Sequence, residues 1–176
     1  MTMGKLETYL KYRPQMKTGD LLLWKSRSVI GWLIRLFSRG NVNHAGLVLD
    51  LHEFAHLIDR RWTLEALEPG IVLHLLSRRL GKHDGSVWWY PLKDDYDYCR
   101  LDLGAWAIEK VGTPYDYGSL FKNALGRVSA DANKFFCSEY AYMAYRENGI
   151  NLDFEKAPRP ADMPSFGIFE EPIQIL

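Results

Sequence analysis

The stretch Phe135–Tyr140 constrains the fold more than any other, because a helical pattern starts at its cysteine. From Cys137 onward, small and aromatic residues recur at helical spacing, and Gly149 stands where the helix would end. A thiol in the first turn of a helix lies at the positive end of the helix dipole, beside backbone N–H groups that lack partners. Both features favour the thiolate, so Cys137 is a candidate nucleophile. The other interpretation is a buried cysteine that only packs, which is the commoner fate of a lone thiol.

The composition indicates a globular protein with a substantial core. Of the 176 residues, 47% are hydrophobic and 14% are aromatic, which excludes an intrinsically disordered chain. This length suits one domain, which we expect to cover residues 1–176. The 22 basic residues equal the 22 acidic residues, so the overall charge does not favour nucleic-acid binding. We therefore expect no nucleic-acid partner.

The sequence contains no recognisable targeting or membrane-spanning segment. Residues Met1–Pro14 alternate charged and apolar side chains and lack the core of a signal peptide. The most apolar window, Val29–Phe37, is interrupted by Arg35 and is too short to cross a bilayer. Two cysteines, Cys99 and Cys137, do not make a disulfide framework. We expect a cytoplasmic protein with reduced thiols.

The remaining pattern predicts short strands that alternate with helices. The expected strands cover Leu21–Trp24, Asn43–Leu49, Trp62–Leu67, Ile71–Leu76, Ser86–Leu92 and a last one within Ile168–Ile175. The expected helices cover Ser28–Ser38, Leu101–Val111, Tyr117–Leu125 and the segment that starts at Cys137. This mixture predicts an α+β fold, in which a small antiparallel sheet or partial barrel packs against the Cys137 helix and its neighbours.

A thiol nucleophile needs a base beside the sulfur and a third polar group that orients the base. His44 stands at the head of one expected strand, and Glu65 lies on the next. If the two strands form an antiparallel hairpin, Glu65 can approach the imidazole from behind. A histidine at a strand start is often structural, but an unpaired carboxylate in an apolar strand is costly, and a pairing with His44 would remove that cost. Cys99 has neither a predicted helix start nor a histidine partner, so we expect it to be inert.

Five short motifs occur in an order that resembles a known family. They are Gly19–Leu22, Asn43–Leu49, Leu64–Ala66, Gly112–Asp116 and Phe136–Glu139. Together they resemble the circularly permuted, papain-like NlpC-type superfamily, and most of all its YaeF/YiiX-like group. Lecithin:retinol acyltransferase-like proteins share the permuted order, in which the histidine strand precedes the cysteine helix. The resemblance covers about residues 19–149, and it implies a permuted papain-like fold.

The resemblance also implies residue roles and a reaction. Cys137 would be the nucleophile, His44 the base and Glu65 its orienting partner, while Tyr115 would match the active-site tyrosine that precedes the cysteine. The third member varies in this superfamily, so His74 and Glu68 are alternatives to Glu65. The implied chemistry is that of a cysteine hydrolase or acyltransferase acting on amide or ester bonds through a thioester. Such chemistry requires no cofactor and no metal.

A rival motif, His52–His56, matches the zinc-peptidase pattern H-E-x-x-H. Its metzincin extension would need glycine at position 59 and histidine at position 62, where the chain has Asp59 and Trp62. The segment also falls in the connection between two expected strands rather than in a long helix. We therefore favour a solvated turn and keep the zinc peptidase as an alternative. A further alternative is a lipid- or peptide-binding module that kept the fold without the chemistry.

The expected helix Ser28–Ser38 suggests the substrate class, because its apolar residues occupy more than one face. Packing one face leaves others, such as Ile30, Ile34 and Phe37, in need of cover. The candidate substrate-binding residues are Trp32, Ile34 and Phe37. The cationic residues Lys25, Arg27, Arg35 and Arg39 flank or interrupt the helix, which suits peripheral contact with a membrane. We expect a small-molecule, lipid or peptide substrate, with a hydrophobic group against this helix. The alternative is a helix that is simply part of the core.

Overall fold

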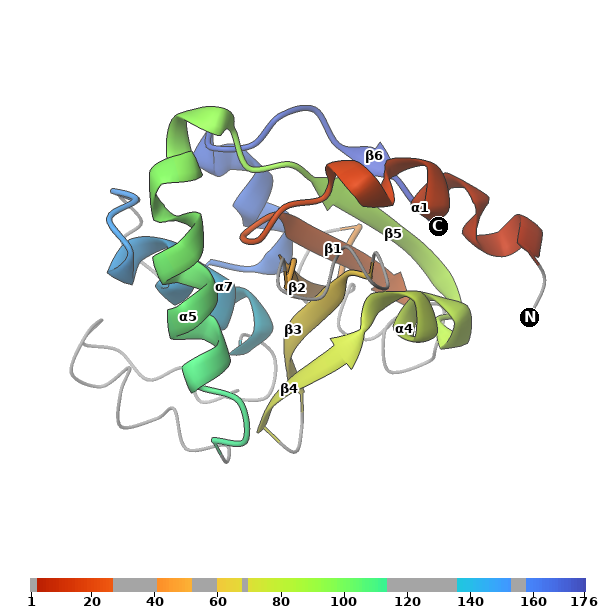
Figure 1. Cartoon of the computed structure of the whole chain (residues 1–176), viewed down its shortest axis with the longest axis horizontal. Helices are drawn as coiled ribbons and strands as arrows, with labels where there is room; N and C mark the ends of the chain where they lie inside the picture. Colours follow the sequence, from red (N-terminus) through yellow and green to blue (C-terminus); the bar gives the residue numbers. More distant parts are fainter. Residues whose placement is uncertain (1–2, 27–40, 52–59, 68–69, 114–135, 153–157) are drawn as a thin grey trace.

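The computed structural model describes residues 3–26, 41–51, 60–67, 70–113, 136–152 and 158–176. Six strands of this part form one antiparallel sheet in the order β4-β3-β2-β1-β5-β6 (Figure 1). They are β1 (Leu21–Ser26), β2 (His44–Leu49), β3 (Trp62–Leu67), β4 (Gly70–Leu75), β5 (Gly85–Tyr90) and β6 (Ile173–Gln174). The sheet is open, and helices pack against it, which confirms the expected α+β class.

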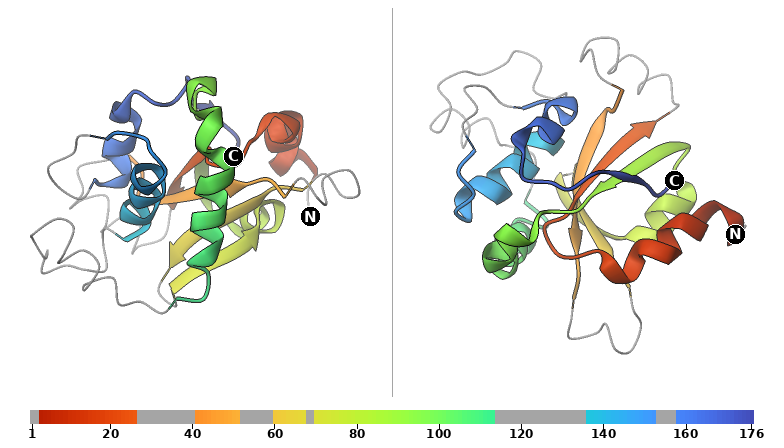
Figure 2. Two further views of the ribbon diagram at one scale, coloured as in Figure 1. Left: turned by 60° about the vertical axis from the view of Figure 1, so that its left-hand side comes forward. Right: turned by 90° about the horizontal axis from the view of Figure 1, so that it is seen from above.

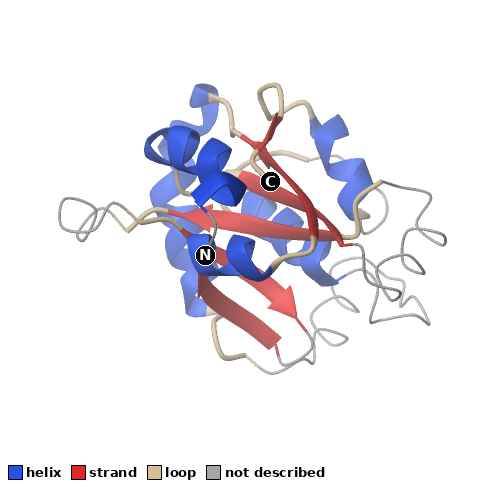
Figure 3. Ribbon diagram, turned by 90° about the vertical axis from the view of Figure 1, so that its right-hand side faces the viewer, coloured by secondary structure: helices blue, strands red, loops and turns tan. Residues whose placement is uncertain are grey.

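Helices cover both faces of this sheet. The described α-helices are α1 (Glu7–Tyr12), α4 (Leu76–Lys82), α5 (Arg100–Glu109) and α7 (Phe136–Glu147). Short 3-10 helices are η1 (Met3–Leu6), η2 (Arg13–Gln15), η3 (Asp94–Cys99) and η5 (Pro160–Phe166). Helices α5 and α7 lie on one face, while α1 and α4 lie on the other (Figures 2 and 3). No helix within the described ranges is long and apolar enough to cross a membrane.

Two buried clusters of apolar residues follow from the alternation of side chains along each strand. The cluster beneath α5 and α7 takes from the first strands Leu21, Leu23, Ala45, Leu47, Leu49, Leu64 and Ala66. The cluster beneath α1 and α4 takes from them Leu22, Trp24 and Val48. By the same alternation, His44 and Glu65 belong to the face that α4 covers.

The strands β1, β2 and β3 begin and end close to the expected positions, but the segment after β4 differs from the prediction. The expected strand Ile71–Leu76 is one residue too long, because Leu76 opens the helix α4, which the sequence pattern did not reveal. Leu76 and Leu80 stand four residues apart and are fully buried against the sheet. Tertiary burial therefore decides the conformation of a segment whose polar residues suggest a solvated connection. The expected helices Ser28–Ser38 and Tyr117–Leu125 lie outside the described residues.

The helix that carries the candidate nucleophile is fixed by three hydroxyl groups. The phenol of Tyr145 donates a hydrogen bond to the carbonyl of Gly19 (2.8 Å), and that of Tyr140 donates to Ala107 on α5 (2.8 Å). Ser138 donates to the carbonyl of Pro158 (2.6 Å). The helix ends at Glu147, and Gly149, just beyond it, adopts a left-handed conformation (φ 89°), as the sequence predicts. These hydrogen bonds tie α7 to the turn before β1, to α5 and to the segment before η5, while the helix packs against β2 and β3.

Candidate active site

His44 and Glu65 come together through the β2–β3 hairpin. The two strands pair antiparallel, with Leu47 opposite Leu64, so that Glu65 stands diagonally across from His44 on the same face. The Nε2 atom of His44 lies 2.6 Å from Oε2 of Glu65. This contact is the pairing that the hairpin hypothesis predicts.

The room for this contact comes from Gly46, which stands between the two side chains. A Cβ atom at this position would lie 3.0 Å from Cγ of Glu65 and 3.0 Å from Oγ1 of Thr63. Distances this short would require the Glu65 or Thr63 side chain to shift by a few tenths of an ångström. Glycine at position 46 therefore lets the Glu65 side chain cross to His44 along the surface of β2.

Cys137 lies at the start of α7, where its thiol forms a hydrogen bond with the His44 ring. His44 is the first residue of β2, so its ring stands at the end of the sheet and can reach the helix on the other face. The Nε2 atom is occupied by Glu65, which leaves Nδ1 for the sulfur. Backbone N–H groups of Ala45 and Ser138 also form hydrogen bonds with Cys137. The structure thus connects Cys137, His44 and Glu65 by successive hydrogen bonds, and this hydrogen-bonded set is called the line.

The electrostatics of this line favour charge separation. Burial alone would raise the pKa of the Cys137 thiol, but the cationic His44 and the hydrogen bonds to the sulfur outweigh burial and lower this pKa. Burial alone would lower the pKa of His44, whereas the Cys137 thiolate and then Glu65 raise the pKa to about 10. Thiolate and imidazolium therefore stabilise one another at neutral pH.

Glu65 is the most buried charged group of the site, with none of its side chain exposed. Burial would raise the pKa of this carboxyl, but His44 and Arg79 lower the pKa to about 2. Arg79 belongs to α4, and its Nε and one terminal nitrogen lie 3.1 to 3.2 Å from the two carboxylate oxygens. The sequence analysis did not identify Arg79, because α4 was not predicted.

Cys99 differs from Cys137 in its partner rather than in its position on a helix. The expectation that Cys99 has no helix start is wrong, since α5 begins at Arg100 and Cys99 is its N-cap residue. Its thiol donates to the carbonyl of Tyr96 (3.2 Å), and burial raises its pKa. Among the described groups, no histidine contributes to this shift. A helix start alone therefore does not activate a thiol in this chain.

Of the two alternatives to Glu65 as the third member, the described residues include His74 but not Glu68. Nδ1 of His74 lies 3.8 Å from Oε1 of Glu65, too far for a hydrogen bond, and the side chain is 44% exposed. His74, on β4, is thus a neighbour of Glu65, which lies on β3. Glu68 and Tyr115 lie outside the described residues, as do the zinc-peptidase motif His52–His56 and the expected substrate-binding residues Trp32, Ile34 and Phe37. Within the described ranges, no three potential metal ligands converge.

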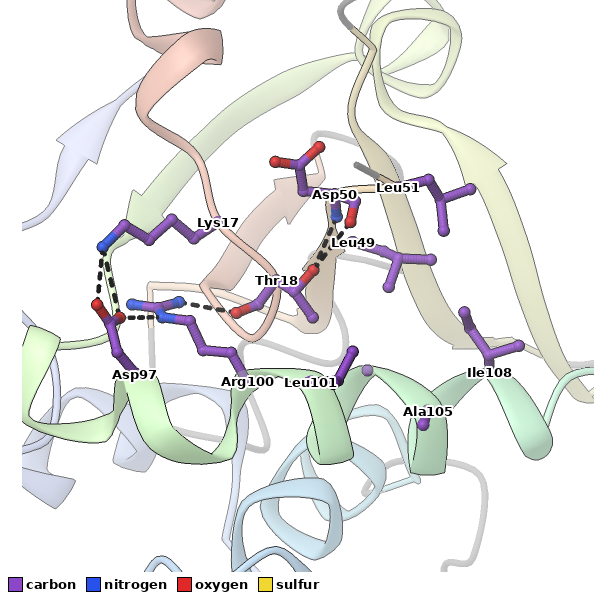
Figure 4. Close-up of a pocket in the computed structure, with 11 residues that line it drawn as sticks. Lys17, Thr18, Leu49, Asp50, Leu51, Asp97, Arg100, Leu101, Ala105 and Ile108 are labelled. Atoms are coloured by element: carbon purple, nitrogen blue, oxygen red, sulfur yellow. Dashed lines mark hydrogen bonds and ion pairs between the residues drawn. The ribbon is translucent and has the colours of Figure 1, made fainter. Parts of the chain in front are cut away.

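A pocket of about 560 Å³ lies at the other end of β2, between this strand and α5 (Figure 4). Its apolar walls include Leu49 and Ile108. The charged side chains at its rim are already paired, since Asp97 binds both Lys17 and Arg100. His44 and Leu49 are the first and last residues of β2, so the pocket lies about 16 Å along the strand from the histidine. This pocket is separate from the thiol site.

Comparisons with known proteins agree with this arrangement. The model of a family described as permuted papain-like amidase enzyme, YaeF/YiiX, C92 family, matches residues 15–162. Among solved structures, the chain is similar to that of the metalloprotein YiiX from Escherichia coli O157:H7, with 19% sequence identity and a TM-score of 0.56. The similarity covers 77% of this chain and 67% of the YiiX chain. A comparison with curated proteins gave no match. The resemblance drawn from the five motifs is thus confirmed.

Proposed function

Since the chain belongs to the permuted papain-like amidase family, we propose that it cleaves amide or ester bonds by covalent thiol catalysis. Cys137 is the nucleophile, His44 carries the proton, and Glu65 orients the imidazole. The observation that carries the proposal is the 2.6 Å contact between His44 Nε2 and Glu65 Oε2, on the far side of a ring that also holds the Cys137 thiol. This arrangement supplies the base and the orienting group that a thiol nucleophile needs.

The first half of the cycle forms a thioester. His44 already holds the thiol proton as imidazolium, and the Cys137 thiolate attacks the carbonyl carbon of the substrate. The carbonyl oxygen becomes an oxyanion, and the imidazolium then gives its proton to the leaving amine or alcohol as the bond to carbon breaks. Glu65 remains ionised throughout, because its pKa of about 2 lies far below neutral pH.

The second half of the cycle releases the acyl group. Water, or another acceptor with an O–H or N–H group, loses a proton to His44 and attacks the thioester carbonyl. The Cys137 sulfur leaves as a thiolate and the proton stays on His44, so that the acyl product departs and the enzyme returns to the ion pair from which it started. Water makes the protein a hydrolase, and another acceptor would make it an acyltransferase. The amidase description of the family favours hydrolysis of an amide.

The start of α7 supports stabilisation of the oxyanion. The backbone N–H of Ser138 already points at the sulfur of Cys137, and the 12-residue helix directs its positive end at the same place. An oxyanion that forms beside this sulfur comes within reach of these donors. We also propose that the substrate carries a hydrophobic or acyl group, because apolar residues occupy more than one face of the helix expected at residues 28–38.

Trapping of the acyl-enzyme tests this proposal. The protein is mixed with p-nitrophenyl esters and p-nitroanilides of short and long acyl chains, and the acid-quenched protein is mapped by mass spectrometry. We expect the acyl mass on Cys137 and none on Cys137→Ala, while Cys99→Ala behaves like the wild type. His44→Ala should lose turnover although it keeps the thiol. An acyl group on another residue, or full turnover by Cys137→Ala, would contradict the proposal.

A further inference from the structure

We infer that Arg79 is a positioning residue of this site, which holds Glu65 in the orientation and the charge state that His44 requires. The inference deepens the proposed thiol chemistry and rests on it. Arg79 touches neither His44 nor Cys137 in any described contact, so that it acts through the carboxylate.

The contact between Arg79 and Glu65 is bidentate. Nε of Arg79 lies 3.1 Å from Oε1 of Glu65, and a terminal nitrogen lies 3.2 Å from Oε2. Oε2 is also the oxygen that contacts Nε2 of His44, at 2.6 Å. A planar guanidinium that donates hydrogen bonds to both oxygens fixes the plane of the carboxylate as well as its position. The carboxylate plane in turn determines how Oε2 meets the imidazole.

Arg79 is itself held in place. Its guanidinium lies over the ring of Trp24, with 4.6 Å between its central carbon and the ring centroid. Trp24 is 1% exposed and belongs to β1, so the cation rests on a fixed surface of the sheet. The neighbouring residue on α4, Arg78, is exposed. Adjacent arginines of one helix thus have different surroundings, and only Arg79 faces the site.

The charges of the line also require a cation beyond Glu65. With Cys137 as thiolate, His44 as imidazolium and Glu65 as carboxylate, the buried line carries one net negative charge, and Arg79 makes the sum zero. Without Arg79, the desolvated negative charge would favour a proton on the carboxylate or on the thiol. Both changes weaken the thiolate, so the thiol of Cys137 would titrate at higher pH.

Other titratable groups also face this site. His74 of β4 approaches Glu65 at 3.8 Å, and its side chain is 44% exposed. His83 follows α4, and burial and the charges of Arg79 and Lys5 lower its pKa. Lys5 donates to the carbonyl of His83 (2.7 Å). The test therefore changes Arg79 alone and leaves these groups in place.

The experiment follows the rate at which iodoacetamide alkylates Cys137, as a function of pH, in folded full-length protein. Mass spectrometry reports the Cys137 peptide, so that no substrate is needed. We expect Arg79→Gln to move the midpoint upward by about one pH unit. Arg79→Lys keeps the positive charge, so its midpoint should stay close to that of the wild type. Arg78→Gln is the matched control and should titrate as the wild type does.

The outcomes separate two kinds of failure. A wild-type midpoint near 9.0, the usual thiol value, would contradict the proposed thiol chemistry itself. A low wild-type midpoint that Arg79→Gln leaves unchanged would overturn the role of Arg79 alone, because a merely structural residue lowers stability without moving the titration. An equal shift in Arg79→Lys and Arg79→Gln would also overturn it, since the charge would not be the cause.

A second measurement does not depend on the folding of Arg79 variants. In His44→Gln the imidazole is gone, and Arg79 remains the close cationic partner of Glu65 among the described residues. A carbon NMR titration of the side-chain carboxyl then reports how well Arg79 holds the charge. We expect the pKa of Glu65 to stay below its usual value of 4.5 despite complete burial. A pKa above that value would overturn the inference.

Discussion

Two buried carboxylates, Asp20 and Glu65, are each bound by an arginine, yet they serve different purposes. Asp20 is 1% exposed and accepts hydrogen bonds from four residues. Its oxygens receive hydrogen bonds from the backbone N–H groups of Lys17 and Leu92, the indole of Trp89 and the guanidinium of Arg100. Described donors thus reach both oxygens of this carboxylate.

The Asp20 cluster joins parts of the fold rather than performing chemistry. Arg100 also donates to the carbonyls of Thr18 (2.7 Å) and Leu92 (2.6 Å), so that it connects the start of α5 to the ends of β1 and β5. Backbone amides, an indole and a guanidinium keep their protons at neutral pH. A carboxylate held only by such donors is a fixed anchor.

Glu65 has one partner of another kind. Arg79 holds it as Arg100 holds Asp20, but the remaining contact goes to an imidazole that can gain and lose a proton and that also binds a thiol. The comparison shows that a buried ion pair can take part in chemistry when a group that gains and loses a proton lies beside it. Each prediction below separates the anchor from the chemical site.

The largest expected effect is the loss of turnover in Cys137→Ala. The variant removes the sulfur that forms the thioester, so hydrolysis of the ester and anilide probes should fall by a factor of about 10⁴ or more. Cys99→Ala lies beside the Asp20 cluster and should keep its turnover. Initial rates of both variants, measured on folded protein, check this contrast, which an active Cys137→Ala would break.

The two carboxylates themselves should respond in opposite ways to amide substitution. Glu65→Gln should lower turnover roughly 10²- to 10⁴-fold, because the imidazole loses its anionic partner. Asp20→Asn should instead lower the free energy of unfolding by about 3–5 kcal/mol, because Arg100 loses its buried counter-charge and keeps only the half-exposed Asp97. Denaturant titrations and the pH profile of turnover check both variants. If Asp20→Asn changed the pH profile of its folded fraction, the comparison would fail.

Two crowded glycines offer a finer contrast. Gly46→Ala should push Glu65 away from His44, so turnover should fall at least about tenfold. A Cβ atom at Gly104 on α5 would lie 2.7 Å from Cγ2 of Thr18, near the Asp20 cluster. Gly104→Ala should therefore destabilise the protein while the folded fraction keeps its turnover. Equal turnover losses in both variants would indicate general damage to the fold.

The smallest expected effect is a change in how stability depends on pH. The pKa of His44 is raised from 6.5 to about 10, so its contribution is complete below pH 6.5 and is lost as the pH rises through the folded value. The pKa of Cys137 is lowered from 9.0, so its contribution grows with pH up to that value. Below pH 9.0 the two slopes oppose one another wherever both groups titrate, because the contribution of His44 falls with pH while that of Cys137 rises.

The wild type should thus lose stability most steeply above about pH 9, the ordinary thiol value, where the contribution of Cys137 no longer grows. In Cys137→Ala no thiolate compensates, and Glu65 remains to raise the pKa of His44. The stability of this variant should therefore begin to fall above about pH 6.5, by at most about 1.4 kcal/mol per pH unit. Thermal unfolding midpoints across this range measure the difference. Parallel curves for the two proteins would mean that Cys137 and His44 do not share a proton.

Local patterns in the sequence predicted the parts of the site that neighbouring strands build. Apolar alternation places His44 at the start of β2 and Glu65 within β3, and a short-range hairpin then brings them together. The cost of burying a lone carboxylate supplied the reason for the pairing. Cys137 followed from the helical spacing after it. These features depend on residues close along the chain or on one strand pairing.

The other parts depend on distant contacts and gave no such signal. Arg79 stands in a short helix whose polar residues suggest a solvated connection, and only packing on the sheet shows that it faces Glu65. Asp20 reads as a turn residue, although its partners Trp89 and Arg100 lie about seventy to eighty positions away. The N-cap position of Cys99 was missed because charged residues precede α5.

The pairing of the Cys137 thiol with His44 is tested most directly by a comparison of the two cysteines. Folded wild-type protein is treated with limiting iodoacetamide near neutral pH, and both cysteine peptides are quantified by mass spectrometry. We expect Cys137 to react at least about tenfold faster than Cys99, because its pKa is lowered by His44 while burial raises that of Cys99. His44→Ala should abolish this preference. Faster alkylation of Cys99 in the wild type, or an unchanged preference in His44→Ala, would contradict the pairing.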